Sequence, residues 1–212
     1  MIIDYADFTR ASNLIHPIQG AALLLLGAAE AYALDNDGRR LTLSAAAALA
    51  LSGALMFAVI LALPGRWSPA QLAVALSVRR GFYIFVSFAC VYSAAGLSLL
   101  TKEALGRGGG GWLATFLGLL AFAGVLYFVL AWRVDAEAWR RVLVWHAAIG
   151  GTLLLAVAAR AADVFRPRRP LRLAWAALLL LTGFQLALYR ETASAFAPRL
   201  ITVESSTGRP GR

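Results

Sequence analysis

The stretch LIHPIQGAALLLLGAAEAY (residues 14–32) decides the fold, because it stays apolar over the length that a helix needs to cross a bilayer. A hydrocarbon core of roughly 30 Å takes about 20 residues of α-helix. The apolar residues run on without alternating, whereas a strand of a membrane β-barrel alternates over about 10 residues. Similar apolar blocks follow along the chain. We therefore expect an all-α polytopic membrane protein.

The composition excludes the other broad classes. Of the 212 residues, 60% are hydrophobic and 15% are charged, and the mean hydropathy is +0.71. Soluble globular domains are nearer to roughly 45–50% apolar and 25% charged. A disordered chain is also excluded, because such a chain lacks the apolar surface that is abundant here.

Six transmembrane helices fit the apolar blocks, with polar or Gly- and Pro-rich turns between them. The expected helices cover residues 14–34, 41–63, 80–100, 112–132, 142–162 and 171–190. We take residues 1–194 as a single transmembrane domain and residues 195–212, which end in SSTGRPGR, as a disordered C-terminal tail. The expected location is a bacterial inner membrane.

The positive net charge of the chain indicates contact with a membrane surface rather than with nucleic acid. The formal net charge is +9, and the arginines lie at the ends of the apolar blocks. Arginines in such places set the topology and contact lipid headgroups. The single cysteine, Cys90, excludes an internal disulfide, a CxxC redox pair and a cysteine metal cluster.

An internal repeat stands out when the two ends of the apolar region are compared. ADFTRASNLIHPIQGAALLLLGAAEA (residues 6–31) aligns without a gap with AEAWRRVLVWHAAIGGTLLLAVAARA (residues 136–161), and this pairs His16 with His146. The match is informative because the chain has only two histidines. The offset covers four helices, so the first two and the last two are expected to form a parallel repeat. The third and fourth helices have no partner in it.

The paired histidines predict a cofactor. Ionisable residues inside membrane segments are expensive and mark functional sites by default. Neutral imidazole is an axial ligand of haem iron, and the repeat predicts that His16 and His146 face each other from different helices at one depth. We therefore expect them to be the iron ligands of a b haem. Two alternatives stay open: another pigment or metal, and histidines that only bond headgroups or neighbouring backbone.

Two further matched pairs fit the same site. Gly20 and Gly150 lie four residues after the histidines, on the same helix face. Because glycine has no side chain, we expect room there for a flat macrocycle. Arg10 and Arg140 lie six residues before the histidines, towards the membrane surface, where they are expected to pair with haem propionates.

Two resemblances involve the first helix. Residues 14–32 resemble the first helix of small cytochrome b561-like membrane proteins, which implies haem binding and electron transfer. Those families carry four histidines for two haems, so the two histidines here imply one haem. His16-Pro17-x-x-Gly20 also resembles the start of the HPxxGxDH motif of six-helix nickel permeases, but Ala22 and Leu23 replace its aspartate and second histidine.

These observations together predict a membrane subunit of cytochrome b type. It would bind one haem and pass electrons between a partner redox protein and quinone. The competing hypotheses are a non-catalytic structural membrane subunit of a larger complex and a small metal or solute permease.

Overall fold

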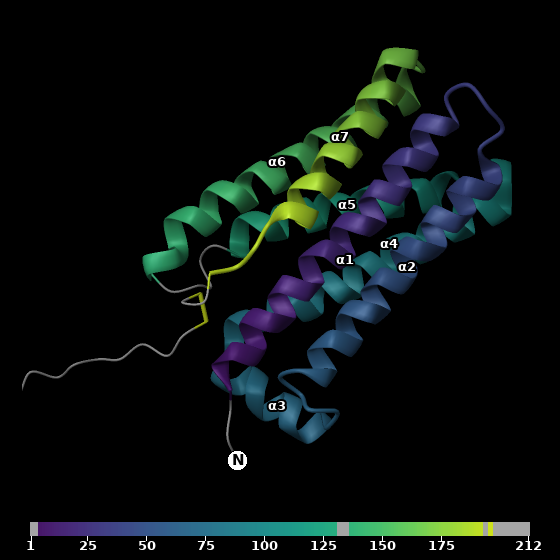
Figure 1. Ribbon diagram of the computed structural model, residues 1–212. Helices are drawn as coiled ribbons and strands as arrows, with labels where there is room; N and C mark the ends of the chain where they lie inside the picture. Colours follow the sequence, from purple (N-terminus) through teal and green to yellow (C-terminus); the bar gives the residue numbers. More distant parts are fainter. Residues whose placement is uncertain (1–3, 131–135, 193–194, 197–212) are drawn as a thin grey trace, which may run out of the picture.

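The computed structural model describes residues 4–130, 136–192 and 195–196 (Figure 1). In this part of the chain seven α-helices follow one another, joined by turns and two short 3-10 helices. Their bounds are α1 (Tyr5–Tyr32), α2 (Arg39–Ala62), α3 (Pro69–Val78), α4 (Tyr83–Leu105), α5 (Gly110–Leu130), α6 (Ala136–Phe165) and α7 (Arg169–Leu188).

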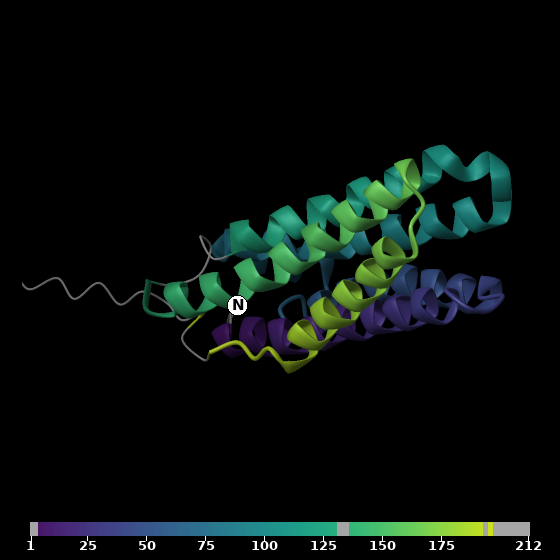
Figure 2. The ribbon, with the colours of Figure 1, turned by 90° about the horizontal axis from the view of Figure 1, so that it is seen from above.

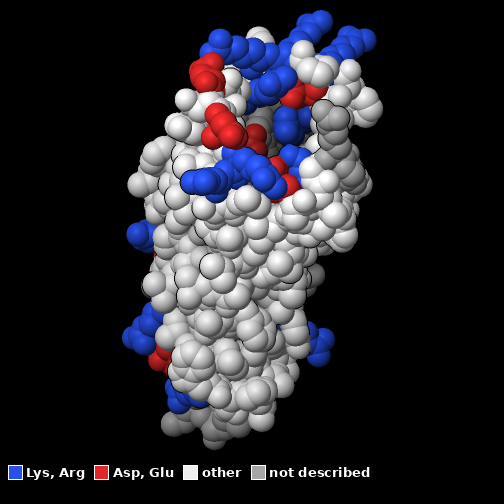
Figure 3. Space-filling view, turned by 90° about the vertical axis from the view of Figure 1, so that its right-hand side faces the viewer, with Lys and Arg blue, Asp and Glu red and all other residues white. Residues whose placement is uncertain are grey.

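The expected fold class is confirmed. All the described helices except α3 are long and apolar enough to cross a membrane, which gives six candidate spans. Charged side chains cover one end of the molecule and others lie along the edges towards the opposite end, while most of the face between them carries none (Figure 3). The six apolar helices therefore place the protein in contact with a lipid bilayer.

Local signals explain the differences from the expected helix bounds. Helix α1 begins at Tyr5 instead of residue 14, because Asp4 caps it by accepting from the Ala6 main-chain nitrogen at 2.9 Å. Helix α3 was not expected. Ser68 caps its N-terminus by accepting from the Gln71 nitrogen at 3.3 Å, and Pro69 occupies the first helical position, where no main-chain N–H is needed.

The six long helices form a ring in which each packs against two neighbours. The order around the ring is α1, α2, α4, α5, α6 and α7, and α7 closes it against α1 (Figures 1 and 2). Helices α1, α4 and α6 run in one direction along the bundle, and α2, α5 and α7 return. The bundle therefore consists of three hairpins, α1–α2, α4–α5 and α6–α7.

The hairpins meet at three close contacts of the same kind, in each of which a glycine lies against a main-chain carbonyl of the next hairpin. The contacts join Gly183 of α7 to Gly20 of α1, Gly124 of α5 to Gly150 of α6, and Gly53 of α2 to Ala89 of α4. A Cβ atom added at Gly183 or Gly124 would lie 2.8 or 3.4 Å from the facing carbonyl oxygen, and one at Gly53 would lie closer still. Small residues at such points let helix backbones approach closely in a membrane.

Burial follows the same register. In α1, α4 and α6, the residue three positions after the contact residue is fully buried. In α2, α5 and α7, the residue four positions before the contact glycine is fully buried. These residues are Leu23, Tyr92 and Leu153 in the first group and Leu49, Leu120 and Leu179 in the second. The α4–α5 hairpin thus packs in register with the other two, although its sequence showed no match. The superposition of α1–α2 on α6–α7 stays a prediction.

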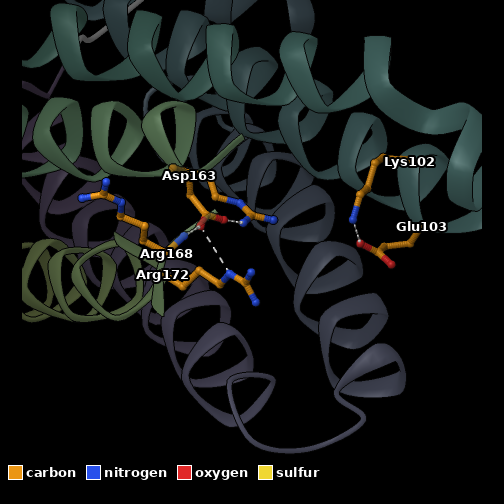
Figure 4. A network of polar contacts seen from close by, with 6 residues as sticks. Lys102, Glu103, Asp163, Arg168 and Arg172 are labelled. Atoms are coloured by element: carbon orange, nitrogen blue, oxygen red, sulfur yellow. Dashed lines mark hydrogen bonds and ion pairs between the residues drawn. The ribbon is translucent and has the colours of Figure 1, made fainter. Parts of the chain in front are cut away.

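A network of charges ties α6 to the start of α7 (Figure 4). The Asp163 carboxylate accepts from Arg160 at 2.7 Å, from the Arg172 side chain at 3.3 Å and from the main-chain nitrogen of Arg168 at 3.0 Å. Because Asp163 is only 5% exposed, its three donors replace the water that it loses on folding. The basic turn between these helices is therefore held by one carboxylate.

The first two residues of the expected tail pack against the bundle. Ala195 and Phe196, which were assigned to it, are 0% and 3% exposed. The Phe196 ring packs on Phe8 and Phe82, and its carbonyl accepts from Arg79 at 2.6 Å. Burial of a large aromatic side chain holds this segment against the bundle. The rest of the expected tail, residues 197–212, lies outside the described residues.

Adjacent glycines on α6 give a test of the close contacts. A Cβ atom at Gly150 would lie 2.6 Å from the Gly124 oxygen, whereas one at Gly151 meets nothing within 4 Å. We expect Gly150→Ala to lower the free energy of unfolding by about 1–3 kcal/mol through overpacking. Gly151→Ala should leave the free energy of unfolding unchanged or raise it by up to about 1 kcal/mol, because alanine favours the helix and meets open space. Thermal unfolding in detergent measures both, and equal effects would contradict the contact.

Candidate functional site

The two histidines meet inside the bundle. His16 of α1 and His146 of α6 are 1% and 0% exposed, and their Nε2 atoms lie 3.3 Å apart. The ring centroids are 5.5 Å apart, and the ring planes are inclined by 67°. The two positions that the repeat pairs thus bring together the only two imidazoles of the chain.

Each imidazole is held by its own helix. His16 Nδ1 lies 2.7 Å from the Ser12 carbonyl oxygen, and His146 Nδ1 lies 2.8 Å from that of Val142, both one turn earlier. A carbonyl oxygen only accepts, so each Nδ1 must carry a proton and donate it. In the neutral ring, Nε2 then carries a bare lone pair. This tautomer is inferred from the hydrogen bonds, which fix it for both rings.

Two bare lone pairs that face each other at 3.3 Å repel. The repulsion is not screened, because the rings are buried in a medium of low dielectric constant. A positive centre between the nitrogens, either a metal ion or a shared proton, turns the contact into an attractive one. The arrangement is therefore suited to holding a cation between two neutral nitrogen donors.

Aromatic rings enclose the pair. The Tyr189 ring centroid lies 4.8 Å from that of His16 and 4.7 Å from that of His146, so this ring covers both. Phe85 of α4 stands edge-on to His16 with centroids 6.0 Å apart, and Tyr127 of α5 lies 6.1 Å from His146. Side chains from several segments thus exclude water from the nitrogens.

A buried carboxylate lies next to the histidine pair. The Tyr189 hydroxyl donates to Glu191 Oε1 at 2.9 Å, and the Ser12 hydroxyl donates to Oε2 at 3.4 Å. The Glu191 main-chain nitrogen donates to Asn13 Oδ1 at 2.7 Å. Glu191 is 7% exposed. The chain beyond α7 is therefore tied to the helix turn that precedes His16.

The matched glycines lie at helix contacts, and the matched arginines lie at the surface, towards which the sequence placed them. Gly20 and Gly150 lie against the backbones of α7 and α5, so they serve helix packing, and their place beside a macrocycle stays a prediction. Arg10 is exposed and donates to Asp7 at 3.4 Å, and Arg140 is exposed as well. Both arginines thus lie on the surface of the bundle.

Sequence reasoning missed Phe85, Tyr189 and Glu191. Nothing in the local pattern distinguishes Phe85 from the other aromatic residues of its helix, and Glu191 follows the last apolar block. Only the ring order of the helices brings them to the histidines. Among the described residues no group of three or more His, Cys, Asp or Glu side chains could hold a metal ion. The candidate centre therefore consists of two ligands.

No protein-family model, curated protein or solved structure matches this chain. The geometry of the site therefore carries the functional argument.

The pH dependence of stability tests the buried carboxylate. Burial raises the pKa of the Glu191 carboxyl above its usual range, against the opposing hydrogen bonds from Tyr189 and Ser12. The folded state then keeps its proton at pH values where the unfolded chain has lost it. Stability from this group is greatest below the unfolded pKa and falls as the pH rises through the folded pKa. At pH values above both the folded and the unfolded pKa, each unit by which the pKa is raised lowers the free energy of unfolding by about 1.4 kcal/mol.

We expect Glu191→Gln to raise the unfolding temperature at neutral pH and to flatten its fall between mildly acidic and neutral pH. Glutamine keeps an oxygen that accepts from Tyr189 but carries no charge. Thermal unfolding over a pH series in detergent measures the effect. The control is Asp37→Asn at the opposite end of α1, where an exposed carboxylate loses its charge in the same way. A steeper pH dependence in Glu191→Gln would contradict the burial of a destabilising charge.

Proposed function

We propose that this protein is a membrane cytochrome of b type, with one haem between α1 and α6 and His16 and His146 as its axial ligands. The observation that supports it best is the approach of two bare Nε2 atoms to 3.3 Å, with both Nδ1 atoms tied to main-chain carbonyls. Metal-bound histidines use the same second contact to fix their tautomer and orientation.

The donor set fits a haem iron. Imidazole nitrogens bind transition metals at about 2.0–2.1 Å, so two axial ligands need about 4 Å between their nitrogens. The two rings would have to move apart by less than about 1 Å, which a small shift of α1 and α6 provides. The two Nε2 atoms already face each other across the gap between α1 and α6.

Aromatic side chains would line the bound group. Tyr189 covers both imidazoles and belongs to the extended segment after α7, so its ring is the one that makes way. Phe85 and Tyr127 remain as apolar walls. The charged groups near this end that would meet propionates come from the exposed Arg10 and Arg140 and from Arg190, not from the interior.

When bound, the haem supplies a one-electron couple inside the bilayer. This chain's own residues would hold it: the imidazoles would bind the iron, the two carbonyls orient the imidazoles, and the aromatic rings exclude water. Electron exchange with a partner redox protein and with quinone completes the proposal, and a bacterial inner membrane is the proposed location.

The second candidate is a structural membrane subunit without a cofactor. The distance of 3.3 Å also suits a proton shared between the imidazoles, which would join the two Nε2 atoms by a hydrogen bond. In that case the pair would brace α1 against α6. For a metal permease, the described residues hold no group of three or more His, Cys, Asp or Glu side chains that could bind the ion.

Absorption spectra of the purified protein decide between the candidates. The protein is produced in cells supplied with a haem precursor, and spectra are recorded after oxidation and after reduction with dithionite. We expect the bands of a low-spin bis-histidine b haem, at one haem per chain. His16→Ala and His146→Ala should each remove the haem, because ligation is a direct bond. Arg10→Ala and Arg140→Ala should only loosen it.

Leu14→Ala, on the exposed face of α1 next to the site, is the matched control and should keep the full spectrum. A colourless, folded protein under these conditions would contradict the cytochrome and support the structural subunit. Haem that persists in both histidine variants would place the cofactor elsewhere and would also contradict the proposal.

A further inference from the structure

The matching register of the three hairpins defines a third position at the histidine site. His16 lies four residues before Gly20, and His146 lies four residues before Gly150, at equivalent contacts of α1 and α6. The equivalent contact residue of α4 is Ala89, whose carbonyl lies against Gly53. The residue four positions before Ala89 is Phe85.

A second contact in each helix supports this register. A Cβ atom at Gly27 of α1 would lie 3.1 Å from the Ala176 oxygen of α7, and one at Gly96 of α4 would lie 2.7 Å from the Ala46 oxygen of α2. Gly27 and Gly96 lie seven residues after the first contact positions in both helices. The alignment of α4 with α1 therefore rests on two independent contacts per helix.

The side chain of Phe85 lies where this register places it. It is 1% exposed, and its ring is edge-on to that of His16, with the planes at 85°. It also packs on Phe82, with the ring centroids 4.6 Å apart. Three helices that run in the same direction thus bring two imidazoles and one phenyl ring to the same level of the bundle.

We propose that Phe85 is the specificity-determining residue of this site: it occupies the third ligand position and, by withholding a third donor, stops the histidine pair from becoming a centre for a bare divalent ion such as Zn²⁺. Three histidines and one open position form a catalytic type of zinc site. Two histidines without a third donor leave such an ion under-coordinated in an apolar interior. The preference for a flat macrocycle rests on the proposed function, but the third ligand position does not.

Restoring a donor at this position tests the inference. We expect Phe85→His and Phe85→Cys to bind Zn²⁺ at one ion per chain, at least about 100-fold more tightly than the unchanged protein, because a direct ligand contributes more than the 10–100-fold of an outer-shell partner. Affinity is measured in detergent by competition with a chelating dye. Cysteine is smaller than phenylalanine, so this variant keeps the proposal testable if histidine overpacks the core.

Two controls separate a third ligand from general effects. Phe85→Leu keeps an apolar side chain and should bind Zn²⁺ no better than the unchanged protein. Phe88→His places an imidazole one turn further along α4 and should bind it at least about 10-fold more weakly than Phe85→His. Adding His16→Ala to Phe85→His should abolish the gain.

The outcomes are distinct from those of the haem experiment. Tight zinc binding by the Phe85 donor variants supports the third position whether or not the unchanged protein contains haem. Folded Phe85→His and Phe85→Cys variants without tighter zinc binding overturn the inference, and so does equal binding by Phe88→His. If the unchanged protein contains haem, Phe85→His loaded with zinc should lose it, and full retention of both would overturn the role of Phe85 in specificity.

Discussion

The close approach of helix backbones at glycines is the constraint on which the rest of this bundle depends. Apolar side chains gain little from leaving lipid for a protein interior, so packing and small residues must hold the helices together. The Gly183–Gly20 and Gly124–Gly150 contacts fix the depth of α1 and α6 against their neighbours. Because each histidine lies one turn before its contact, the two imidazoles are held at one level of the membrane.

The chemistry of the site follows from how each imidazole is tied. The carbonyls of Ser12 and Val142 take the Nδ1 protons, which leaves both Nε2 atoms bare and facing. In water such a pair would separate or take up a proton. Inside a ring of helices with aromatic walls, separation requires two helices to move. The fold therefore holds a site that a positive centre between the two nitrogens would stabilise.

The two ends of the bundle have different roles. At the end of α6 and the start of α7, Asp163 and its arginine partners form a compact charged turn (Figure 4). At the opposite end Phe196 packs against the bundle, and Glu191 ties the chain after α7 to α1. Burial of Glu191 destabilises its charged form, and this unfavourable burial lies next to the candidate site. The charged turn thus lies at the end away from the histidines, and the buried carboxylate lies at the end beside them.

The sequence by itself determined the six helices. The length and hydropathy of each apolar block are local properties, and they alone decide whether a helix can span the bilayer. It also identified His16 and His146, because the internal repeat aligns these two residues and the chain has no other histidine. Only the tertiary structure decided that Gly20 and Gly150 lie at close contacts with the backbones of α7 and α5. The same holds for Phe85 and Tyr189, which reach the imidazoles from other segments. Which helices become neighbours depends on the shape complementarity of whole helix surfaces, and the hydropathy of a segment does not reveal this shape.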